Sequence, residues 1–389
     1  MRSLFAIEKV DLAAAVTGAV PLFGLGFVIV RPNRLAEGVA VSLREAAGSL
    51  AVVIAVLWLL LIVLAVSAVP GRVRYSIIGI TAGTLIPLLL LAAGRQAAMV
   101  AASQGTIARV SLGPGFWFSL FALTVILVNS LSGRGQTRSI LVAVAVLSAG
   151  TVLYLLLSGR LDALSLMREF AQRRSRFFLE LRSHLVLAIT SVVTATAIGL
   201  PLGLLTHRKA ATRAPTFFTL NTLQTIPSLA LFGILIPVLA ALTARFPFLS
   251  EVGVQGIGTA PALIALIAYS LLPVVRNTYT GFSTVDPAVV EAGLGMGMTR
   301  GQLLIRIELP IACPVILNGI RVALVQTVGL TAVAALIGAG GFGVFIFQGL
   351  GQAASDLILL GAVPTIVIAV IADTLMNAVT GVIRPRGLR

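Results

Sequence analysis

The chain has 389 residues, of which 58% are hydrophobic and only 11% are charged, with a formal net charge of +15. Soluble domains typically contain about 25% charged residues, so this composition excludes a soluble globular protein and indicates a polytopic membrane protein. The positive charge does not indicate a nucleic-acid partner, because the basic residues, nearly all of them Arg, lie in short loops between apolar segments.

Ten apolar segments of about 20 residues are long enough to cross a bilayer. They predict an all-α polytopic membrane protein with about ten transmembrane helices, over residues 11–30, 48–69, 75–93, 113–131, 138–157, 184–205, 215–242, 259–275, 311–337 and 356–380. Arg2 and Lys9 ahead of the first segment resemble the start of a signal peptide, but the length of the segment favours a retained span.

The segment 160–182 separates two groups of five predicted spans. It combines several arginines with apolar residues at helical spacing, which predicts an amphipathic helix lying in the membrane interface. A helix that binds an anionic partner explains the pattern less well. We therefore expect an N-terminal membrane domain of about five helices over residues 1–159, this connector, and a C-terminal membrane domain over residues 183–389.

Polar residues surround a proline inside the predicted span 215–242. Polar side chains beside a proline kink line a pathway or satisfy the carbonyl groups that the kink frees. The candidate residues of a translocation pathway are Gln224, Thr225, Pro227 and Ser228. Purely structural hydrogen bonding is the alternative.

Residues 286–310 lie between two apolar segments and predict a short helical hairpin. Asp286 is a favourable N-cap, and Pro287 follows at the first helical position, where its missing N–H costs nothing. Three glycines follow at positions where the chain can turn at positive φ, namely Gly293, Gly295 and Gly297. The alternative is a solvated loop with two turns of helix.

The second helix of the hairpin is expected to begin at Thr299. Thr299 and Gln302 have the spacing of a capping box, in which each side chain bonds the backbone N–H of the other residue. Leu303, Leu304 and Ile307 then supply an apolar face. Pro310 is expected to end this helix before the next apolar segment.

Two opposite charges lie in the last two predicted spans. Arg321 follows Pro310 by eleven residues, and Asp373 precedes Arg384 by eleven residues, so both sit at a similar depth from the same membrane edge. A single charge inside the membrane is unfavourable, so we expect an intramembrane ion pair between them. The alternative is that Arg321 extends to the membrane surface while Asp373 is protonated.

A glycine-rich loop separates the same two spans, at Gly338, Gly340, Gly341, Phe342 and Gly343. Its spacing fits a dinucleotide fingerprint, but the loop follows a long apolar helix rather than a strand, which disfavours nucleotide binding. We expect a tight turn at the outer gate, where glycine lets backbones approach closely. Phe342, Phe345 and Phe347 would plug or line the gate or, alternatively, contact lipid.

The hairpin also resembles a known motif. Its letters are similar to the E-A-A-x3-G-x9-I-x-L-P loop of ABC importer permeases at Glu291, Ala292, Gly293, Gly297, Ile307, Leu309 and Pro310. Only the third letter departs from the motif, with Gly293 in place of Ala. In that family the loop is the cytoplasmic coupling helix that docks on the ATPase subunit, so the resemblance implies an ATPase-coupling role for these residues.

The wider C-terminal half, from His184 onward, resembles the five-helix core of the type I ABC importer permeases, in the osmoprotectant (glycine betaine and choline) branch. The stretches that carry this resemblance are 198–203, 224–230 and 337–343. The N-terminal half resembles the longer permeases of the branch, which carry an extra membrane domain.

The resemblance implies a permease of an ATP-driven importer of a small compatible solute in the bacterial inner membrane, working by alternating access. Its expected partners are two ABC ATPases that bind ATP and Mg²⁺, a second permease copy or a paralogue, and an external solute-binding protein. The chain itself is expected to be no enzyme and to hold no cofactor or metal. With a cytoplasmic hairpin, ten spans place both termini in the cytoplasm.

Other features leave an alternative open. The chain has no G-x4-G-K-[ST] phosphate loop, and Cys313, His184 and His207 are too few for a zinc, haem or disulfide set. The excess of Arg and Lys on the hairpin side is modest. The alternative function is a secondary transporter driven by an ion gradient, which predicts an inverted repeat and midplane carboxylates. A membrane enzyme is disfavoured because no catalytic set converges.

Overall fold

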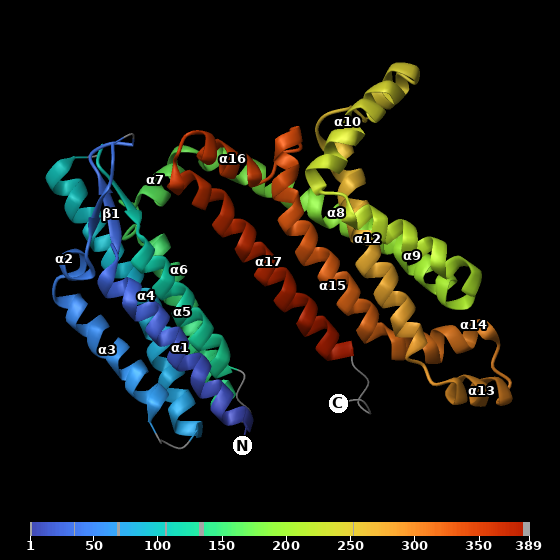
Figure 1. Cartoon of the computed structure of the whole chain (residues 1–389), viewed down its shortest axis with the longest axis horizontal. Coiled ribbons are helices and arrows are strands. Elements are labelled where there is room, and N and C mark those ends of the chain that lie inside the picture. The colour runs from blue at the N-terminus through green and yellow to red at the C-terminus, as the bar shows by residue number, and fades with distance from the viewer. Residues whose placement is uncertain are drawn as a thin grey trace. The chain divides into compact units, whose positions relative to one another are not determined.

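The computed structural model describes residues 2–34, 36–67, 71–105, 107–131, 136–251 and 253–383. These residues form two compact units, unit 1 (Met1–Gln172) and unit 2 (Arg173–Arg389), which are described separately (Figure 1). The division falls inside the segment 160–182. Instead of one interfacial helix, the chain forms α7 (Ser165–Gln172) in unit 1, and α8 (Arg174–Arg208) then begins unit 2. The helix is interrupted because Arg173 has a non-helical backbone, with φ −118° and ψ 23°.

Unit 1 is a helical bundle with a small sheet. Its other helices are α1 (Arg2–Gly24), α2 (Leu43–Ala47), α3 (Ser49–Val66), α4 (Gly71–Gln104), α5 (Pro114–Leu131) and α6 (Gln136–Leu157). Helix α4 is much longer than the predicted span 75–93 and passes through Gly94 without a break. Gly94 serves close packing there, because a Cβ atom would lie 2.6 Å from the carbonyl oxygen of Arg160.

The sheet of unit 1 was not predicted. Its strands β1 (Val28–Arg31), β2 (Val39–Val41) and β3 (Arg109–Leu112) are antiparallel and lie in the order β2-β1-β3. The expected span 11–30 was therefore wrong at its end, since α1 stops at Gly24. The β-branched residues after Gly26 favour an extended strand, and both neighbouring strands satisfy its backbone groups.

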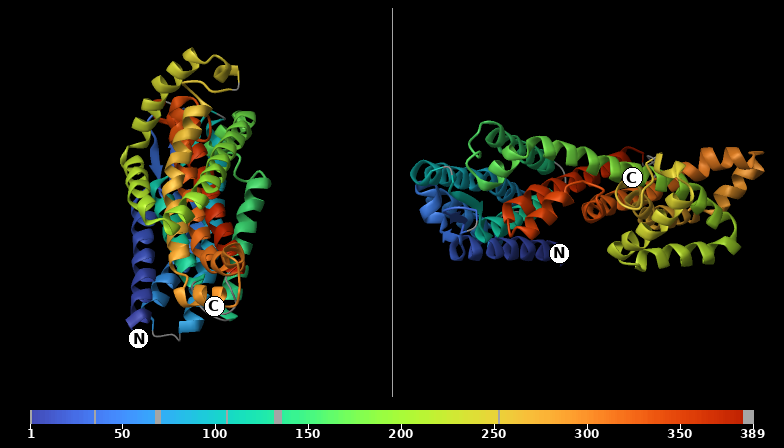
Figure 2. Two further views of the ribbon diagram at one scale, coloured as in Figure 1. Left: turned by 90° about the vertical axis from the view of Figure 1, so that its right-hand side faces the viewer. Right: turned by 90° about the horizontal axis from the view of Figure 1, so that it is seen from above.

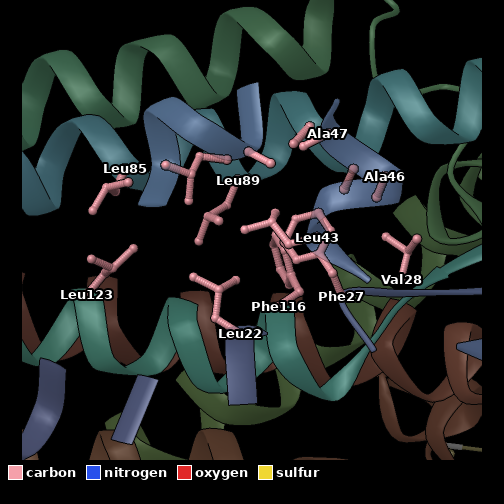
Figure 3. Close-up of a cluster of buried hydrophobic side chains, with 14 of the residues drawn as sticks. Leu22, Phe27, Val28, Leu43, Ala46, Ala47, Leu85, Leu89, Phe116 and Leu123 are labelled. Atoms are coloured by element: carbon pink, nitrogen blue, oxygen red, sulfur yellow. The ribbon is translucent and has the colours of Figure 1, made fainter. Parts of the chain in front are cut away.

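The core of unit 1 joins its helices to the start of the sheet. Leu22 of α1, Phe27 beside β1, Leu85 of α4 and Phe116 of α5 point toward one another in Figure 3 and are fully buried. The rings of Phe27 and Phe116 have centroids 5.9 Å apart. Trp58 of α3 is also buried, and its indole N–H donates to the carbonyl oxygen of Ala15 at 2.9 Å. The sheet is thus packed onto the helical bundle by one shared core.

The described part of unit 2 contains α8 and nine further helices. They are α9 (Ala210–Thr225), α10 (Ser228–Arg245), α11 (Phe248–Glu251), α12 (Thr259–Ser283), α13 (Pro287–Gly295), α14 (Arg300–Leu303), α15 (Leu309–Ala334), α16 (Gly343–Gly351) and α17 (Ser355–Ile383), with a π-helical turn at Leu304–Glu308 and a 3-10 turn at Ala335–Ile337. Helix α12 packs against α8 and α15, and α15 packs against α17. The hairpin of α13 and α14 projects from one end of α12 and α15 (Figures 1 and 2).

Small residues allow the central helices of unit 2 to approach closely. A Cβ atom on Gly199 of α8 would lie 2.8 Å from a methyl carbon of Val274 on α12. One turn along α8, a Cβ atom on Gly203 would lie 2.5 Å from the Cβ atom of Thr278. Such contacts between small residues are a common basis of helix association in membranes. They hold α8 and α12 together along their shared length.

The described residues contain nine helices long and apolar enough to cross a membrane, and α1 adds the shorter apolar stretch Val10–Gly24. This confirms the predicted fold class of a largely helical polytopic membrane protein. The expected span 215–242 was wrong, because the chain breaks at Ile226 and Pro227 into α9 and α10. A residue before proline is disfavoured in the helical conformation, which explains the break. Residues 384–389, which the predicted topology places in the cytoplasm, lie outside the described residues.

Candidate functional site

The first half of the hairpin forms as its sequence predicts. Asp286 is the N-cap of α13, and its side chain accepts a hydrogen bond from the backbone N–H of Ala288 at 2.9 Å. Pro287 occupies the first turn, where its missing N–H leaves no bond unmade. The short helix therefore has a defined start close to the end of α12.

The turn of the hairpin depends on one glycine rather than three. Gly297 has φ +83°, whereas Gly293 and Gly295 lie in α13 and do not have positive φ. The prediction that all three glycines serve the turn was therefore wrong for two of them. The N–H of Met298 donates to the carbonyl oxygen of Gly293 at 3.1 Å, which closes the end of the helix.

Gly293 has a packing role instead. It is buried, and a Cβ atom there would lie 2.7 Å from Cδ1 of Leu303 and 3.2 Å from Cδ1 of Ile307. The two helical arms of the hairpin thus meet across this glycine. Where the motif has Ala as its third letter, the end of the Leu303 side chain here occupies part of the space that a methyl group would take.

The second arm begins with the predicted capping box. The hydroxyl of Thr299 accepts from the N–H of Gln302 at 3.3 Å, and the side-chain oxygen of Gln302 accepts from the N–H of Thr299 at 2.9 Å. The expected end of this arm at Pro310 was wrong. Helix α14 passes through the π-helical turn Leu304–Glu308 directly into α15. Pro310 lies in the first turn of α15 and is tolerated there because the change of hydrogen-bond pattern removes the need for its N–H.

The hairpin exposes several apolar side chains. Val289, Leu294 and Met296 are exposed, and the exposed fraction of Met296 is 75%. Glu291 is also exposed and lines, together with Arg208 and Glu308, a cavity of about 410 Å³. Exposed apolar groups gathered on one projecting element are typical of a protein interaction site.

An ion pair that the sequence analysis missed joins the end of α8 to the π-helical turn at the end of the hairpin. Glu308 is the last residue of the π-helical turn and is almost fully buried, and its carboxylate accepts a hydrogen bond from Nη2 of Arg208 at the end of α8. The only sequence signal was a carboxylate between the apolar residues Ile307 and Leu309. A buried carboxylate needs a partner, but the sequence does not tell which of the nearby arginines supplies it.

The candidate pathway residues lie at the break between α9 and α10. The side-chain amide of Gln224 donates to the carbonyl oxygen of Tyr269 on α12 at 2.9 Å, and the Tyr269 hydroxyl donates to the carbonyl oxygen of Ile226 at 2.5 Å. Thr225 donates to the carbonyl oxygen of Thr222 at 2.7 Å. Gln224 and Thr225 thus make structural hydrogen bonds around the break. Pro227 is exposed, and Ser228, half-buried, begins α10.

The glycine loop between α15 and α16 is a tight turn. Gly338, Gly340 and Gly341 have φ of +81°, +81° and +87°. Gly343 starts α16 in close contact with α15, because a Cβ atom there would overlap the carbonyl oxygen of Ala332 at 1.8 Å. The sequence therefore needs glycine at each of these positions for backbone reasons, as expected for a turn.

The aromatic residues of this loop lie in the core of unit 2. Phe342 and Phe345 are fully buried, and the ring centroid of Phe342 lies 5.1 Å from that of Phe177 on α8. Their burial contradicts the alternative of lipid contact for Phe342 and Phe345. Their role in plugging or lining the outer gate stays a prediction. Phe347 is half-buried.

Two buried polar residues of α8, both missed by the sequence analysis, hold this turn. Oε2 of Glu180 accepts the backbone N–H of Gly341 at 2.6 Å. Nδ1 of His184 accepts the N–H of Phe342 at 3.3 Å, while its Nε2–H donates to the carbonyl oxygen of Val328 at 3.1 Å. Both side chains are fully buried. No local pattern predicts these contacts, because the bonded residues lie far apart in the sequence.

Arg321 and Asp373, the two charges predicted to pair inside the membrane, are brought together. Arg321 of α15 and Asp373 of α17 make a two-point contact, and the side-chain amide of Asn377 also donates to Asp373 at 3.1 Å.

Among the described residues, no group of three or more His, Cys, Asp or Glu side chains has the arrangement of a metal site. Unit 2 thus has three notable features: the projecting hairpin, the ion pair between α15 and α17, and the glycine turn that α8 holds by hydrogen bonds.

Two protein families match the chain. Residues 195–387 match the family described as binding-protein-dependent transport system inner membrane component. Residues 8–167 match the family described as the N-terminal domain of the ABC transporter permease YehY. The first match covers the hairpin and the glycine turn, and the second covers most of unit 1.

Individual relatives are transport permeases as well. The chain is 40% identical over 206 residues to the osmoprotectant import permease protein OsmW of Salmonella typhimurium, a match that covers 53% of this chain and 91% of the relative. It is 37% identical over 209 residues to the glycine betaine/carnitine/choline transport system permease protein OpuCD of Bacillus subtilis, covering 54% and 84% of the two chains. A solved structure of the MetNI methionine ABC transporter has a TM-score of 0.48 at 20% identity, covering 55% of this chain and 99% of that chain.

Proposed function

The chain belongs to the family of binding-protein-dependent transport system inner membrane components, and we propose that it is the permease of an importer for a small osmoprotectant of the glycine betaine and choline type. The resemblance first seen in the hairpin is confirmed by the family match and by the relatives. The proposal of an osmoprotectant rests on what OsmW and OpuCD are described as transporting.

The hairpin of residues 286–310 is the observation that carries the mechanism. It projects from the helices, its start and its second arm are capped, and it exposes apolar side chains. We propose that Glu291, Ala292, Gly293, Gly297, Ile307, Leu309 and Pro310 form the element that docks on a partner ATPase. No phosphate-loop motif is found in the sequence, so the partner would bind ATP and Mg²⁺ and supply the energy.

The full assembly would contain two ATPases, two permease chains and an external solute-binding protein. Closure of the ATPases on ATP would draw the two hairpins together and tilt the helices of unit 2 between inward-open and outward-open states. In this assembly the hairpin and both termini would lie in the cytoplasm and the glycine turn on the outer side. Gln224, Thr225, Pro227 and Ser228 would then border the pathway, and the glycine turn would lie at the outer gate.

Transport by purified protein tests this function. The chain would be reconstituted in proteoliposomes with an ABC ATPase and a solute-binding protein from the same organism, and uptake of radiolabelled glycine betaine, choline and carnitine would be measured. We expect uptake that requires enclosed ATP and is insensitive to ionophores. Uptake driven by an ion gradient without ATP would establish the secondary transporter instead.

A further inference from the structure

Helix α8 is anchored by buried carboxylates at both of its ends. At one end Glu180 holds the glycine turn through the N–H of Gly341 at 2.6 Å, and Glu180 also pairs with Arg176 at 2.5 Å. His184, one turn further along, bonds Phe342 and α15. Glu180 and His184 bind backbone N–H groups of the turn, so the turn cannot shift relative to α8 without breaking these bonds.

The other end of α8 is anchored to the hairpin. The side chain of Glu308 is 4% exposed and that of Arg208 is 43% exposed. Separating the pair would therefore leave a buried carboxylate without its cation, whereas Arg208 could still reach water. A buried charge that loses its partner is strongly unfavourable. A displacement of the hairpin base is thus coupled to a displacement of α8.

The stretch between the two anchors is a continuous helix. Glu180 and Arg208 are separated by about 40 Å at about 1.5 Å per residue. Helix α8 stays unbroken through Pro201, and the close contacts of Gly199 and Gly203 with α12 support it on both sides of that proline. The π-helical turn Leu304–Glu308 ends at the residue that binds Arg208, and such turns are frequently found at functional sites.

From these contacts we propose that α8 is the strut that carries movement of the hairpin to the glycine turn, with Arg208 and Glu308 as the input contact and Glu180 and His184 as the output contact. The inference rests on the proposed function, because it assigns a direction of transmission within an ATP-driven importer. These four residues position the two ends of the helix and need not touch the solute.

The input contact is tested with the double variant Arg208→Met, Glu308→Leu in the reconstituted complex. Removing both charges leaves no stranded carboxylate, so folded yield and ATPase binding should match those of the unaltered chain. The ratio of solute imported to ATP hydrolysed should nevertheless fall at least about fivefold, the lower end of typical coupling energies. The matched control is Lys209→Met, which removes the neighbouring exposed cation and should leave this ratio unchanged.

The output contact is tested at Glu180. A Gln side chain keeps a carbonyl oxygen that can accept the N–H of Gly341, whereas Ala removes the acceptor. We expect Glu180→Gln to retain most of the import per ATP and Glu180→Ala to lose it.

A spin label at Leu350, exposed on α16, reports movement beyond the turn in a Cys313→Ser background. The label is attached through Leu350→Cys, and its mobility should respond to ATP in the labelled chain with Arg208 and Glu308 intact but not in the labelled double variant.

The outcomes separate this inference from the proposed function. If the unaltered chain neither binds an ATPase nor imports solute with ATP, the proposed function fails. If it does both, but the double variant keeps the full ratio of import to hydrolysis and the full response of the label, α8 is only a static brace and the strut is refuted.

Discussion

Arg321 and Asp373, which lie 52 residues apart on α15 and α17, form a two-point ion pair within the helices of unit 2. Nε of Arg321 lies 2.6 Å from Oδ1 of Asp373, and Nη2 lies 3.0 Å from Oδ2. Both side chains are about one-third exposed, at 32% and 37%. The fork of a guanidinium matches a carboxylate in this geometry, so the contact sets the relative rotation of the two helices as well as their charge balance.

The first prediction concerns this pair. Asp373→Asn or Arg321→Gln alone should lower the folded yield or transport, because each leaves one charge inside the membrane without its partner. The double variant should recover part of the loss. The yield is measured by size-exclusion chromatography of detergent extracts, and transport by uptake. Strictly additive losses would show that the two charges are not energetically coupled.

The second prediction concerns the hairpin turn. Gly297→Val should abolish association with the ATPase and uptake while leaving the protein in the membrane. The reason is that Gly297 has φ +83°, where side chains other than glycine cost on the order of 1–2 kcal/mol and β-branched ones more. Gly295→Ala is the matched control, since no heavy atom lies within 4 Å of a Cβ atom at that position. Co-purification of the ATPase measures both, and an equal effect of the two variants would contradict the assignment.

The third prediction concerns the letter that departs from the family motif. Gly293→Ala should weaken the hairpin, because its methyl group would lie 2.7 Å from Cδ1 of Leu303, and overpacking costs about 1–3 kcal/mol. This exceeds the gain of up to about 1 kcal/mol in helix propensity. Adding Leu303→Val removes the obstructing methyl group and should restore ATPase binding. Binding unaffected by Gly293→Ala alone would show that the arms of the hairpin separate easily.

The fourth prediction concerns Glu291 on the exposed face of α13. Glu291→Lys should reduce ATPase association without changing folded yield, since the side chain is exposed and the helix keeps its caps. The effect should weaken in high salt if the contact is electrostatic. Pull-down of the ATPase at low and high ionic strength measures it, and normal association of the variant would remove Glu291 from the docking surface.

The fifth prediction concerns the independence of unit 2. A chain that begins at Arg173 should insert and bind the ATPase, because the units have separate cores and α8 begins at this boundary. A chain that begins at Leu185 keeps the same spans but lacks Glu180 and His184, so it should give a lower folded yield. Degradation of the longer of these two chains would show that both units fold together.

Much of the hairpin could be predicted from the sequence. Its signals are local, since Asp286 and Thr299 bond backbone groups two and three residues away. The pairing of Arg321 with Asp373 could be predicted as well, because a helix converts residue number into depth and the membrane leaves few alternatives for a charge. The family resemblance followed from the spacing of the hairpin letters.

Other features depended on how distant segments pack. The bond from Glu180 of α8 to Gly341 joins residues 161 positions apart, and the bond from Arg208 of α8 to Glu308 joins residues 100 positions apart. No local sequence pattern identifies these partners. Strand β1 formed where the sequence favoured a continuing apolar helix, since its strand partners exist only in the folded unit. Apolar length and caps therefore determined which segments are helices and where the hairpin lies. Tertiary packing decided where the helices stop and which buried charges meet, because those choices depend on neighbours that the sequence brings together only on folding.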